Sequence, residues 1–258
     1  SAALVTEKGI DLRDPKLSRM PDGRFLLLMG GSHYEGTKLL GRQPRVAFSD
    51  DGRTWSAPER ILTEGDWLWR LTWNGDTAYG VAYRPAPRTE ASEASGAPHS
   101  GWLAALYSTK NGREYHFLTD WEIPDRPNET TLRFLDDGSA LALVRREQGN
   151  QRGWIGTARP PFTEWSWKET EHRLGGPNFI EVPGGGLWAT TRIYPGGPKT
   201  ALARLTPESL APALTLPSGG DTSYAGMLWH EGELWLSYYS SHEGKSAIYI
   251  SRIRLPAE

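Results

Sequence analysis

Arginines and a tyrosine stand at matching positions after glycine-containing turns. Arg145 and Arg192 each follow their turn glycine, Gly138 and Gly185, by seven residues, and Tyr239 lies at the same distance from a later turn. A guanidinium presents a planar fork of N–H donors that suits bidentate binding of a carboxylate. Arginines gathered at one place need anions, either from carboxylates of the chain or from a ligand. The matching positions favour a ligand and predict that Arg145 and Arg192 face one another at one site.

Counting outward from each turn, and inspecting the loops, adds further candidates. Glu129 and Tyr224 would each begin the first strand of a repeat, so both side chains would point at the same axis. A Glu within hydrogen-bond reach of a Tyr could take its proton. Loop histidines more often bond to the loop than act as general acids, although their ordinary pKa allows either role. The full set adds Arg13, Asp14, His33, Glu35, Arg70, Tyr83, Asn178, Asp221 and His242.

Five hairpin signals define the elements that must position these residues. Each consists of a β-like run, a turn that contains glycine and a second β-like run, as two-residue hairpin turns require. The turn glycines lie about 52 residues apart on average, at Gly23, Gly75, Gly138, Gly185 and Gly232. Repeats of this length built from short strands are typical of β-propellers, which have four strands in each blade.

The sequence therefore predicts an all-β fold, a five-bladed β-propeller with four-stranded antiparallel blades in a single domain. The predicted blades cover residues 12–63, 67–122, 128–172, 176–216 and 221–256. The last repeat is one strand short. We expect Ala3–Thr6 to supply that strand and close the ring, since closure removes exposed sheet edges.

Composition argues against several classes of function. Lys and Arg total 29 against 31 Asp and Glu, so the net charge of −2 gives no reason to expect nucleic acid or an anionic membrane as a partner. No apolar run approaches the roughly 20 residues of a membrane span. Cysteine is absent, and without a metal-binding motif or a phosphate loop we expect no metal and no cofactor. The 12 Trp and 10 Tyr suit sheets that pack aromatic side chains or offer them to sugars.

A turn motif and the order of the candidates make the chain similar to a known family. Ser49–Trp55 match the Asp-box, S-x-D-x-G-x-T-W, and Ser108–Tyr115 form a degenerate copy. In such a turn the acidic or amide side chain bonds local backbone N–H groups, and Gly takes the left-handed conformation. With Glu129, Tyr224 and the arginines in this order, the chain resembles the sialidase superfamily of Asp-box (BNR-repeat) propellers.

The resemblance implies a function and roles for particular residues. Sialidases hold the sugar carboxylate with three arginines, use a Tyr nucleophile paired with a Glu, and use an Asp as acid/base. The segments Leu12–Pro15, Asn128–Arg146, Thr191–Arg192 and Asp221–Tyr224 resemble the corresponding sialidase segments. The resemblance thus implies an exo-glycosidase that hydrolyses a terminal, acidic sugar from a glycan. The nearby arginines are expected to lower the pKa of the tyrosine.

Three features differ from sialidases. Five repeats are counted, whereas sialidases have six blades. The Arg13-Asp14-Pro15 segment resembles five-bladed furanosidase and phosphorylase families instead. Residues 33–48 contain no Asp, so His33 or Glu35 would have to protonate the leaving oxygen.

Three alternatives remain open at this point. A polysaccharide lyase would also use arginines with Tyr and His, and its product would absorb in the near ultraviolet. A binding propeller would recognise sugars without cleaving them, and the Glu129–Tyr224 pair would then point apart. An inverting hydrolase would use two carboxylates among Asp14, Glu129 and Asp221. For each of these we expect a secreted or periplasmic protein whose leader has been removed.

Overall fold

The computed structural model describes residues 4–86 and 101–256 of the 258-residue chain. Within these residues the strands form five antiparallel sheets, four of four strands and one of three. The described residues contain no helix, and hence none that could cross a membrane. In each sheet the strands follow one another in chain order, as in the blades of a propeller. The predicted five-bladed β-propeller is confirmed, and the chain divides into two compact units, residues 1–126 and 127–258.

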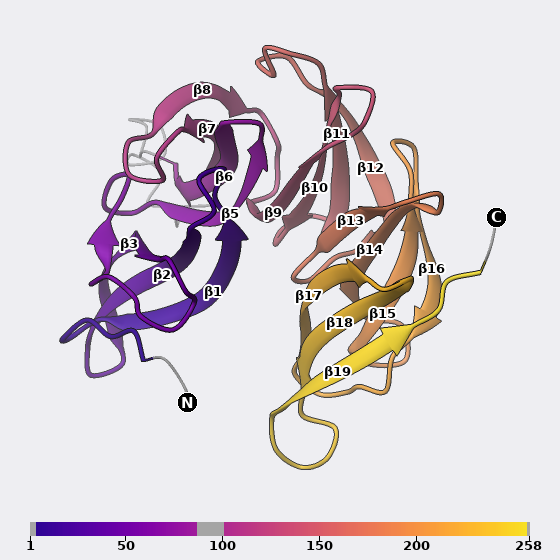
Figure 1. Cartoon of the computed structure of the whole chain (residues 1–258). Coiled ribbons are helices and arrows are strands. Elements are labelled where there is room, and N and C mark those ends of the chain that lie inside the picture. Colours follow the sequence, from indigo (N-terminus) through magenta and orange to yellow (C-terminus); the bar gives the residue numbers. More distant parts are fainter. Residues whose placement is uncertain (1–3, 87–100, 257–258) are drawn as a thin grey trace, which may run out of the picture. The chain divides into compact units, whose positions relative to one another are not determined.

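The first unit holds the first two blades, coloured indigo to magenta in Figure 1. Its core contains Leu26, Leu28, Val46 and Leu68, all buried between these two sheets. Each such side chain contributes about 1.5–3 kcal/mol through its burial. The strands are β1 (Asp11–Arg19), β2 (Phe25–Glu35), β3 (Lys38–Ser49), β4 (Glu59–Arg60), β5 (Trp67–Asn74), β6 (Thr77–Pro85), β7 (Trp102–Thr109) and β8 (His116–Trp121).

The second unit holds the other three blades, and the first strands of these blades are neighbours. One core lies between the third and fourth blades, around Leu143 and Phe179, and another between the fourth and fifth, around Leu202 and Leu234. The strands are β9 (Pro127–Phe134), β10 (Ala140–Arg146), β11 (Arg152–Ala158), β12 (Ser166–Arg173), β13 (Asn178–Val182), β14 (Gly186–Ile193), β15 (Lys199–Leu205), β16 (Leu210–Thr215), β17 (Thr222–His230), β18 (Glu233–Ser240) and β19 (Ala247–Ile253).

The hairpin turns of the structure contain the glycines that the sequence predicts. Four of the five predicted turn glycines have positive φ, which a side chain would disfavour. In the fourth turn the positive φ belongs to Gly184 and Gly186, both at +68°. The intervening Gly185 donates its N–H to the Val182 carbonyl at 2.9 Å. Gly23 and Gly138 make the same bond, to Met20 and Leu135, so the fourth turn lies at the predicted position and only its positive φ angles fall on the neighbouring glycines.

The turn after β3 has the hydrogen bonds that the sequence predicts. The hydroxyl of Ser49 accepts the N–H of Gly52 at 2.9 Å. Oδ1 of Asp51 accepts the N–H groups of Arg53 and Thr54, both at 2.7 Å. Gly52 has a φ of +70°. This segment is thus a compact turn whose polar side chains are used locally.

The turn after β7 repeats the pattern with one correction. Asn111 accepts the N–H groups of the two residues after Gly112, as the acidic residue does in the first turn. The hydroxyl that accepts the Gly112 N–H, at 2.9 Å, belongs to Thr109. Thr109, and not Ser108, is therefore the counterpart of Ser49, because it stands three residues before the glycine.

The fourth strand expected for the fifth blade is not found. Among the predicted residues Ala3–Thr6, those from Leu4 onward form no strand, and Ala3 lies outside the described residues. The following residue, Glu7, pairs instead with Arg45 of β3 at 2.7 Å. This ion pair holds the end of the segment beside the first blade.

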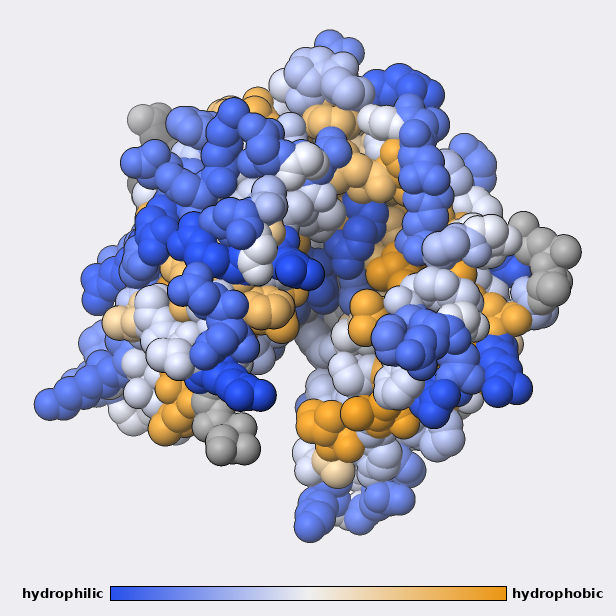
Figure 2. Space-filling model, viewed as in Figure 1, coloured by the Kyte–Doolittle hydropathy of each residue, from blue (hydrophilic) through white to orange (hydrophobic). Residues whose placement is uncertain are grey.

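The three-stranded fifth blade carries apolar side chains on its surface (Figure 2). Leu228 of β17 is 60% exposed, and Ile248 and Ile250 of β19 are 74% and 69% exposed. Exposed and partly buried residues alternate along β19, as successive side chains of a strand point to opposite faces. The exposed face of this strand therefore carries two adjacent isoleucines, followed by Arg252.

Candidate active site

A tyrosine and a glutamate from different blades meet in the second unit. The Tyr224 hydroxyl, on β17, donates a hydrogen bond to Oε1 of Glu129, on β9, with 2.7 Å between the oxygens. The Glu129 side chain is buried. The two residues are 95 positions apart, so their meeting depends on the fold. This geometry allows Glu129 to accept the hydroxyl proton while the phenolic oxygen attacks an electrophile.

Arg145, on β10, holds this pair together. Its Nη1 lies 2.6 Å from Oε2 of Glu129 and 2.8 Å from the Tyr224 hydroxyl. Its Nη2 pairs with Glu147, two residues along the chain. Burial alone would lower the pKa of this guanidinium, but the charge of Glu129, the hydrogen bond to it and the charge of Glu147 outweigh burial and raise the pKa. Arg145 therefore stays charged and balances two carboxylates.

The backbone at Gly176, just before β13, also supports the pair. Its N–H donates to Oε2 of Glu129 at 3.0 Å. Gly176 has a φ of +58°, and a Cβ at this position would lie 2.8 Å from Cγ of Tyr224. Glycine alone combines this backbone conformation with so close an approach of the ring.

A second polar cluster adjoins the tyrosine. Arg192, on β14, donates to Oδ1 of Asp221 at 2.8 Å, to the Tyr239 hydroxyl at 3.0 Å and to the Thr222 carbonyl at 2.8 Å. The Tyr239 hydroxyl donates to the same Asp221 oxygen at 2.7 Å. Cζ of Arg192 lies 5.7 Å from the centre of the Tyr224 ring, within cation–π range. The ring of Tyr224 is thus held by the second cluster and its hydroxyl by the first.

The two arginines predicted to share a site both contact Tyr224. Arg145 does so at the hydroxyl and Arg192 at the ring. Arg145 pairs with two carboxylates of the chain, and Arg192 pairs with Asp221. Of the two sources of anions that the sequence allowed, carboxylates of the chain are present in the structure.

The pKa of Tyr224 is raised, contrary to the expectation that nearby arginines lower it. Burial disfavours the phenolate, and the negative charge of Glu129 disfavours it further. Arg145 and Arg192 act in the opposite direction but are outweighed. Tyr224 is therefore a neutral hydroxyl at neutral pH, and its proton must leave during a reaction.

We expect Tyr224 to remain un-ionised up to at least about pH 10, the ordinary pKa of tyrosine. The folded state binds this proton more tightly than the unfolded state does. The stabilisation is therefore complete below about pH 10 and is lost as the pH rises towards the raised pKa. The measurement is near-ultraviolet absorbance of phenolate against pH, taken as wild type minus Tyr224→Phe. A component of this difference that titrates below about pH 10 would contradict the prediction.

Four predicted site residues lie in β-bulges of the first strands. At Asp14, Arg70, Glu129 and Tyr224, two residues of the first strand oppose one residue of the second. Asp14 and Tyr224 have φ values of +53° and +55°, which cost a non-glycine residue about 1–3 kcal/mol. Bulges re-aim side chains and are frequent beside active sites. Here they turn Glu129 and Tyr224 towards each other.

Asn178 and His242 of the second unit lie outside this constellation. Both amide atoms of Asn178 are engaged, since Nδ2 donates to the Ala225 carbonyl at 2.9 Å and Oδ1 accepts from Arg133 at 3.0 Å. His242 lies in the turn after β18, where Nδ1 is 2.9 Å from the Ser240 hydroxyl. Asn178 thus joins neighbouring blades, and His242 bonds within its loop.

The candidates of the first blade belong to the first unit. Arg13 is paired with Asp11 and is half exposed. The Asp14 carbonyl accepts from Lys16 at 2.8 Å. His33 and Glu35, the sequence-based candidates for the acid, are exposed near the end of β2.

The candidates of the second blade, Arg70 and Tyr83, are more enclosed. Burial lowers the pKa of Arg70 to about 10, and its Nε has no hydrogen-bond partner among the described residues. Tyr83 is buried and its ring stacks on Trp102, with 5.0 Å between ring centres.

Sequence reasoning missed two members of the site, Glu147 and Gly176. Glu147 stands two residues after Arg145. Side chains two residues apart along an extended chain point to the same side, so this spacing could have identified Glu147 as a partner of Arg145. Gly176 lies in a Gly-Gly-Pro segment, and from its sequence this segment predicts a turn and nothing more. Its contact with Tyr224 spans 48 residues and has no local signal.

Replacing Gly176 by Ala is expected to reduce turnover on the order of 10²-fold, because the new methyl group would displace the Tyr224 ring. It should also destabilise the protein by about 1–3 kcal/mol, the cost of a left-handed non-glycine residue. Steady-state kinetics and urea unfolding measure the two effects.

Gly138→Ala is the matched control, because Gly138 has a φ of +77° and a Cβ added there would meet no atom within 4 Å. Gly138→Ala should lower the free energy of unfolding, as Gly176→Ala does, but it should leave turnover unchanged. Equal activity in the two variants would refute the role assigned to Gly176.

No group of three or more metal-binding side chains that could hold an ion occurs within residues 4–86 and 101–256. The polar groups described around Tyr224 are instead bonded to one another. What the arrangement offers is a hydroxyl nucleophile, a carboxylate beside it and charge balance from arginine.

Comparison with known proteins gives a fold likeness. No protein-family model and no curated protein sequence matches the chain. A variant of an α-L-arabinofuranosidase from Fusarium graminearum, bound to an iminosugar inhibitor, has a TM-score of 0.68 at 12% identity, over 94% of this chain and 77% of that one.

Two further solved structures share the fold at low identity. A family 117 glycoside hydrolase from Zobellia galactanivorans has a TM-score of 0.65 at 10% identity, over 97% of this chain and 86% of that one. An endo-arabinase from Bacteroides thetaiotaomicron has a TM-score of 0.63 at 14% identity, over 99% of both chains. These likenesses establish the propeller fold, and the resemblance to sialidases stays a prediction.

Proposed function

We propose that this protein is a glycoside hydrolase in which Tyr224 is the nucleophile and Glu129 is its general base. The observation that carries the proposal is the 2.7 Å hydrogen bond from the Tyr224 hydroxyl to Glu129. A binding propeller would have no need of this pair, whereas a nucleophile must lie beside the base that activates it. The names of the structural relatives, which include an arabinofuranosidase and an endo-arabinase, support a carbohydrate substrate.

In the proposed reaction the phenolic oxygen attacks the anomeric carbon while its proton passes to Glu129. The bond to the leaving oxygen breaks through an oxocarbenium-like state. Water then cleaves the glycosyl–tyrosine bond, and Glu129 returns its proton to Tyr224. The proton that the water loses balances the one that the leaving oxygen takes up, so the net reaction is hydrolysis. Because the anomeric carbon is displaced twice, the product would keep the configuration of the substrate.

We propose further that the sugar is a terminal, acidic one. Arg192 is the arginine that its carboxylate would reach, because the partner of Arg192, Asp221, has a side chain that is 67% exposed. An exposed carboxylate is already largely solvated and contributes little as an ion-pair partner, so a ligand could take its place at little cost. By contrast, Arg145 is bound by a buried glutamate, so it would stay with the catalytic pair.

A screen of aryl glycosides of sialic acid, uronic acids and neutral furanoses tests both proposals. An aryl leaving group needs little protonation, so the screen does not depend on the identity of the acid. Release of the aglycone with retained configuration would support a Tyr224 nucleophile. The glycoside that is hydrolysed most efficiently would show whether the preferred sugar is acidic or neutral. An unsaturated product that absorbs in the near ultraviolet would establish a lyase instead. Inverted configuration would refute the covalent route.

A further inference from the structure

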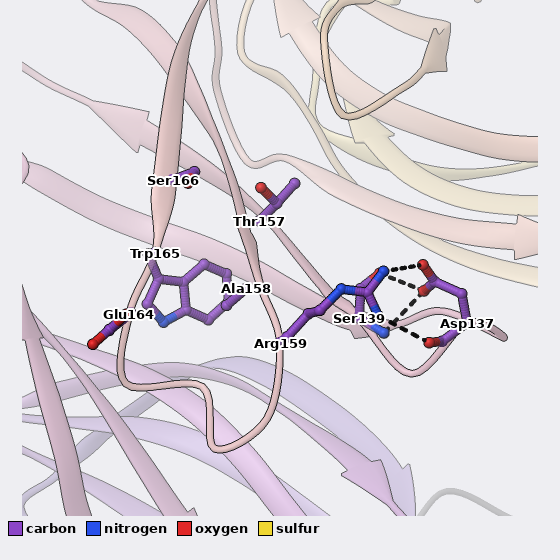
Figure 3. A pocket seen from close by; sticks show the side chains of 8 residues that line it. All are labelled: Asp137, Ser139, Thr157, Ala158, Arg159, Glu164, Trp165 and Ser166. Carbon is purple, nitrogen blue, oxygen red and sulfur yellow. Dashed lines mark hydrogen bonds and ion pairs between the residues drawn. The ribbon is translucent and has the colours of Figure 1, made fainter.

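A cavity lies in the third blade, and Tyr224 is not among the residues that line it (Figure 3). It has a volume of about 510 Å³ and is formed by the turn between β9 and β10 and by the loop between β11 and β12. Trp165 and Glu164 line it from the loop, and Asp137 and Ser139 line it from the turn. Arg159 reaches across to the turn.

The cavity and the candidate active site lie at opposite ends of the same blade. Glu129 is near the beginning of β9, and the cavity begins after β9 ends at Phe134. A strand rises about 3.3 Å per residue, so these two positions are about 17 Å apart along the strand. A ligand of one sugar unit therefore could not touch both sites.

The indole of Trp165 is fixed in position before any ligand arrives. Its Nε1 donates to the Phe162 carbonyl at 2.9 Å. Its ring stacks on that of Trp167, with 5.6 Å between centres and 22° between planes. A pre-ordered aromatic surface loses little entropy on binding.

The polar side chains around the indole are also ordered. Oδ1 of Asp137 accepts the N–H of Ser139 at 2.9 Å, and Oδ2 accepts from Arg159 at 3.2 Å. The Ser139 hydroxyl, which also donates to Oδ1, lowers the pKa of Asp137 together with the Ser139 N–H and Arg159, so Asp137 is a charged acceptor at neutral pH. With Glu164, the cavity has two carboxylates against one guanidinium.

These features match one ligand chemistry. A sugar ring has an apolar face of C–H groups that packs against an indole and a rim of hydroxyls that donate to carboxylates. The excess of negative charge would repel an acidic sugar.

We propose that this cavity is an accessory binding site for a neutral sugar unit within a glycan chain. It does not depend on the function proposed for Tyr224. A site this open would bind one hexose with a Kd on the order of 1 mM, from the usual affinity per non-hydrogen atom. Several neutral units on one chain would raise the apparent affinity.

The test is affinity electrophoresis of the full chain through gels that contain soluble arabinoxylan, dextran or polygalacturonate. A Tyr224→Phe background is used, and release of reducing ends is assayed so that only uncleaved probes are compared. We expect retardation by at least one neutral polysaccharide, weaker retardation by polygalacturonate, and a loss of affinity of about tenfold on Trp165→Ala. Glu164→Ala, an exposed substitution that should not affect folding, should weaken binding about threefold.

Trp235→Ala is the matched control, because it removes a half-buried indole on β18 of the same unit and should bind as the parent does. In the otherwise wild-type chain, Trp165→Ala should leave the hydrolysis of a small aryl glycoside unchanged. The proposal is overturned if neither neutral polysaccharide retards the protein, if folded Trp165→Ala and Glu164→Ala bind like the parent, or if polygalacturonate binds most tightly.

Discussion

Tyr224→Phe is expected to lower turnover on the best aryl glycoside by about 10²-fold or more, with the fold retained. The change removes only the hydroxyl that would attack the anomeric carbon. The ring, which packs against Gly176 and Arg192, is kept. Glu129→Gln should cause a loss of similar order, because the amide cannot accept the proton. Steady-state kinetics on the purified variants provides the measurement.

Tyr249→Phe is the control for this experiment. Tyr249, on β19, donates its hydroxyl to Glu243 at 2.7 Å, away from the Tyr224 cluster, so its loss should leave turnover unchanged. Full activity of Tyr224→Phe would end the tyrosine-nucleophile hypothesis. The inverting route with two carboxylates among Asp14, Glu129 and Asp221 would then lead.

Arg145→Met is expected to destabilise the protein by about 3–5 kcal/mol, the usual cost of removing one member of a buried ion pair. The variant would leave Glu129 without its counter-charge in a buried position, and Glu147 would lose its partner as well. The sequence alone predicts that Arg145 binds a ligand carboxylate, and from a ligand-binding arginine one would expect no effect on folding. The structure changes that prediction because the guanidinium already joins β9, β10 and β17. Equilibrium unfolding in urea gives the free energy.

An exposed ion pair in the same unit provides the comparison. Lys168 and Glu208 are paired at 2.5 Å with both side chains more than half exposed, so Lys168→Met should change stability by less than about 0.5 kcal/mol. Adding Glu129→Gln to Arg145→Met should recover part of the lost stability, because the uncompensated charge is removed. A loss below about 1 kcal/mol in the single variant would show that Arg145 does not carry this charge balance.

The all-β fold and its five repeats could be predicted because their signals are local. A hairpin turn is encoded within a few residues, by glycines that can adopt positive φ, and five such turns at a regular spacing indicate a propeller. The same count located Arg145 and Arg192, and it placed Glu129 and Tyr224 at equivalent ends of first strands. The strand expected at Ala3–Thr6 did not follow from such a signal, since it was inferred from a gap in the last repeat.

What the tertiary structure decided is how these side chains are paired and charged. The bulges at Glu129 and Tyr224 arise from the register of two strands, which no single stretch of sequence specifies. The raised pKa of Tyr224 is the sum of burial, the carboxylate of Glu129 and two guanidiniums, and these charges come from two blades other than that of the tyrosine.

The negatively charged partners of the arginines are a further case in which the sequence determined one part and the tertiary structure the other. The sequence showed that Arg145 and Arg192 would need negative partners, and it placed both near one site. Whether those partners come from the chain or from a ligand depends on distances between side chains. Electrostatic interactions change over a few ångströms, whereas a sequence pattern locates a residue only to a strand and a face. The sequence by itself thus determined the blades and the residues they present, and the packing of blades determined which of those residues are bonded to one another.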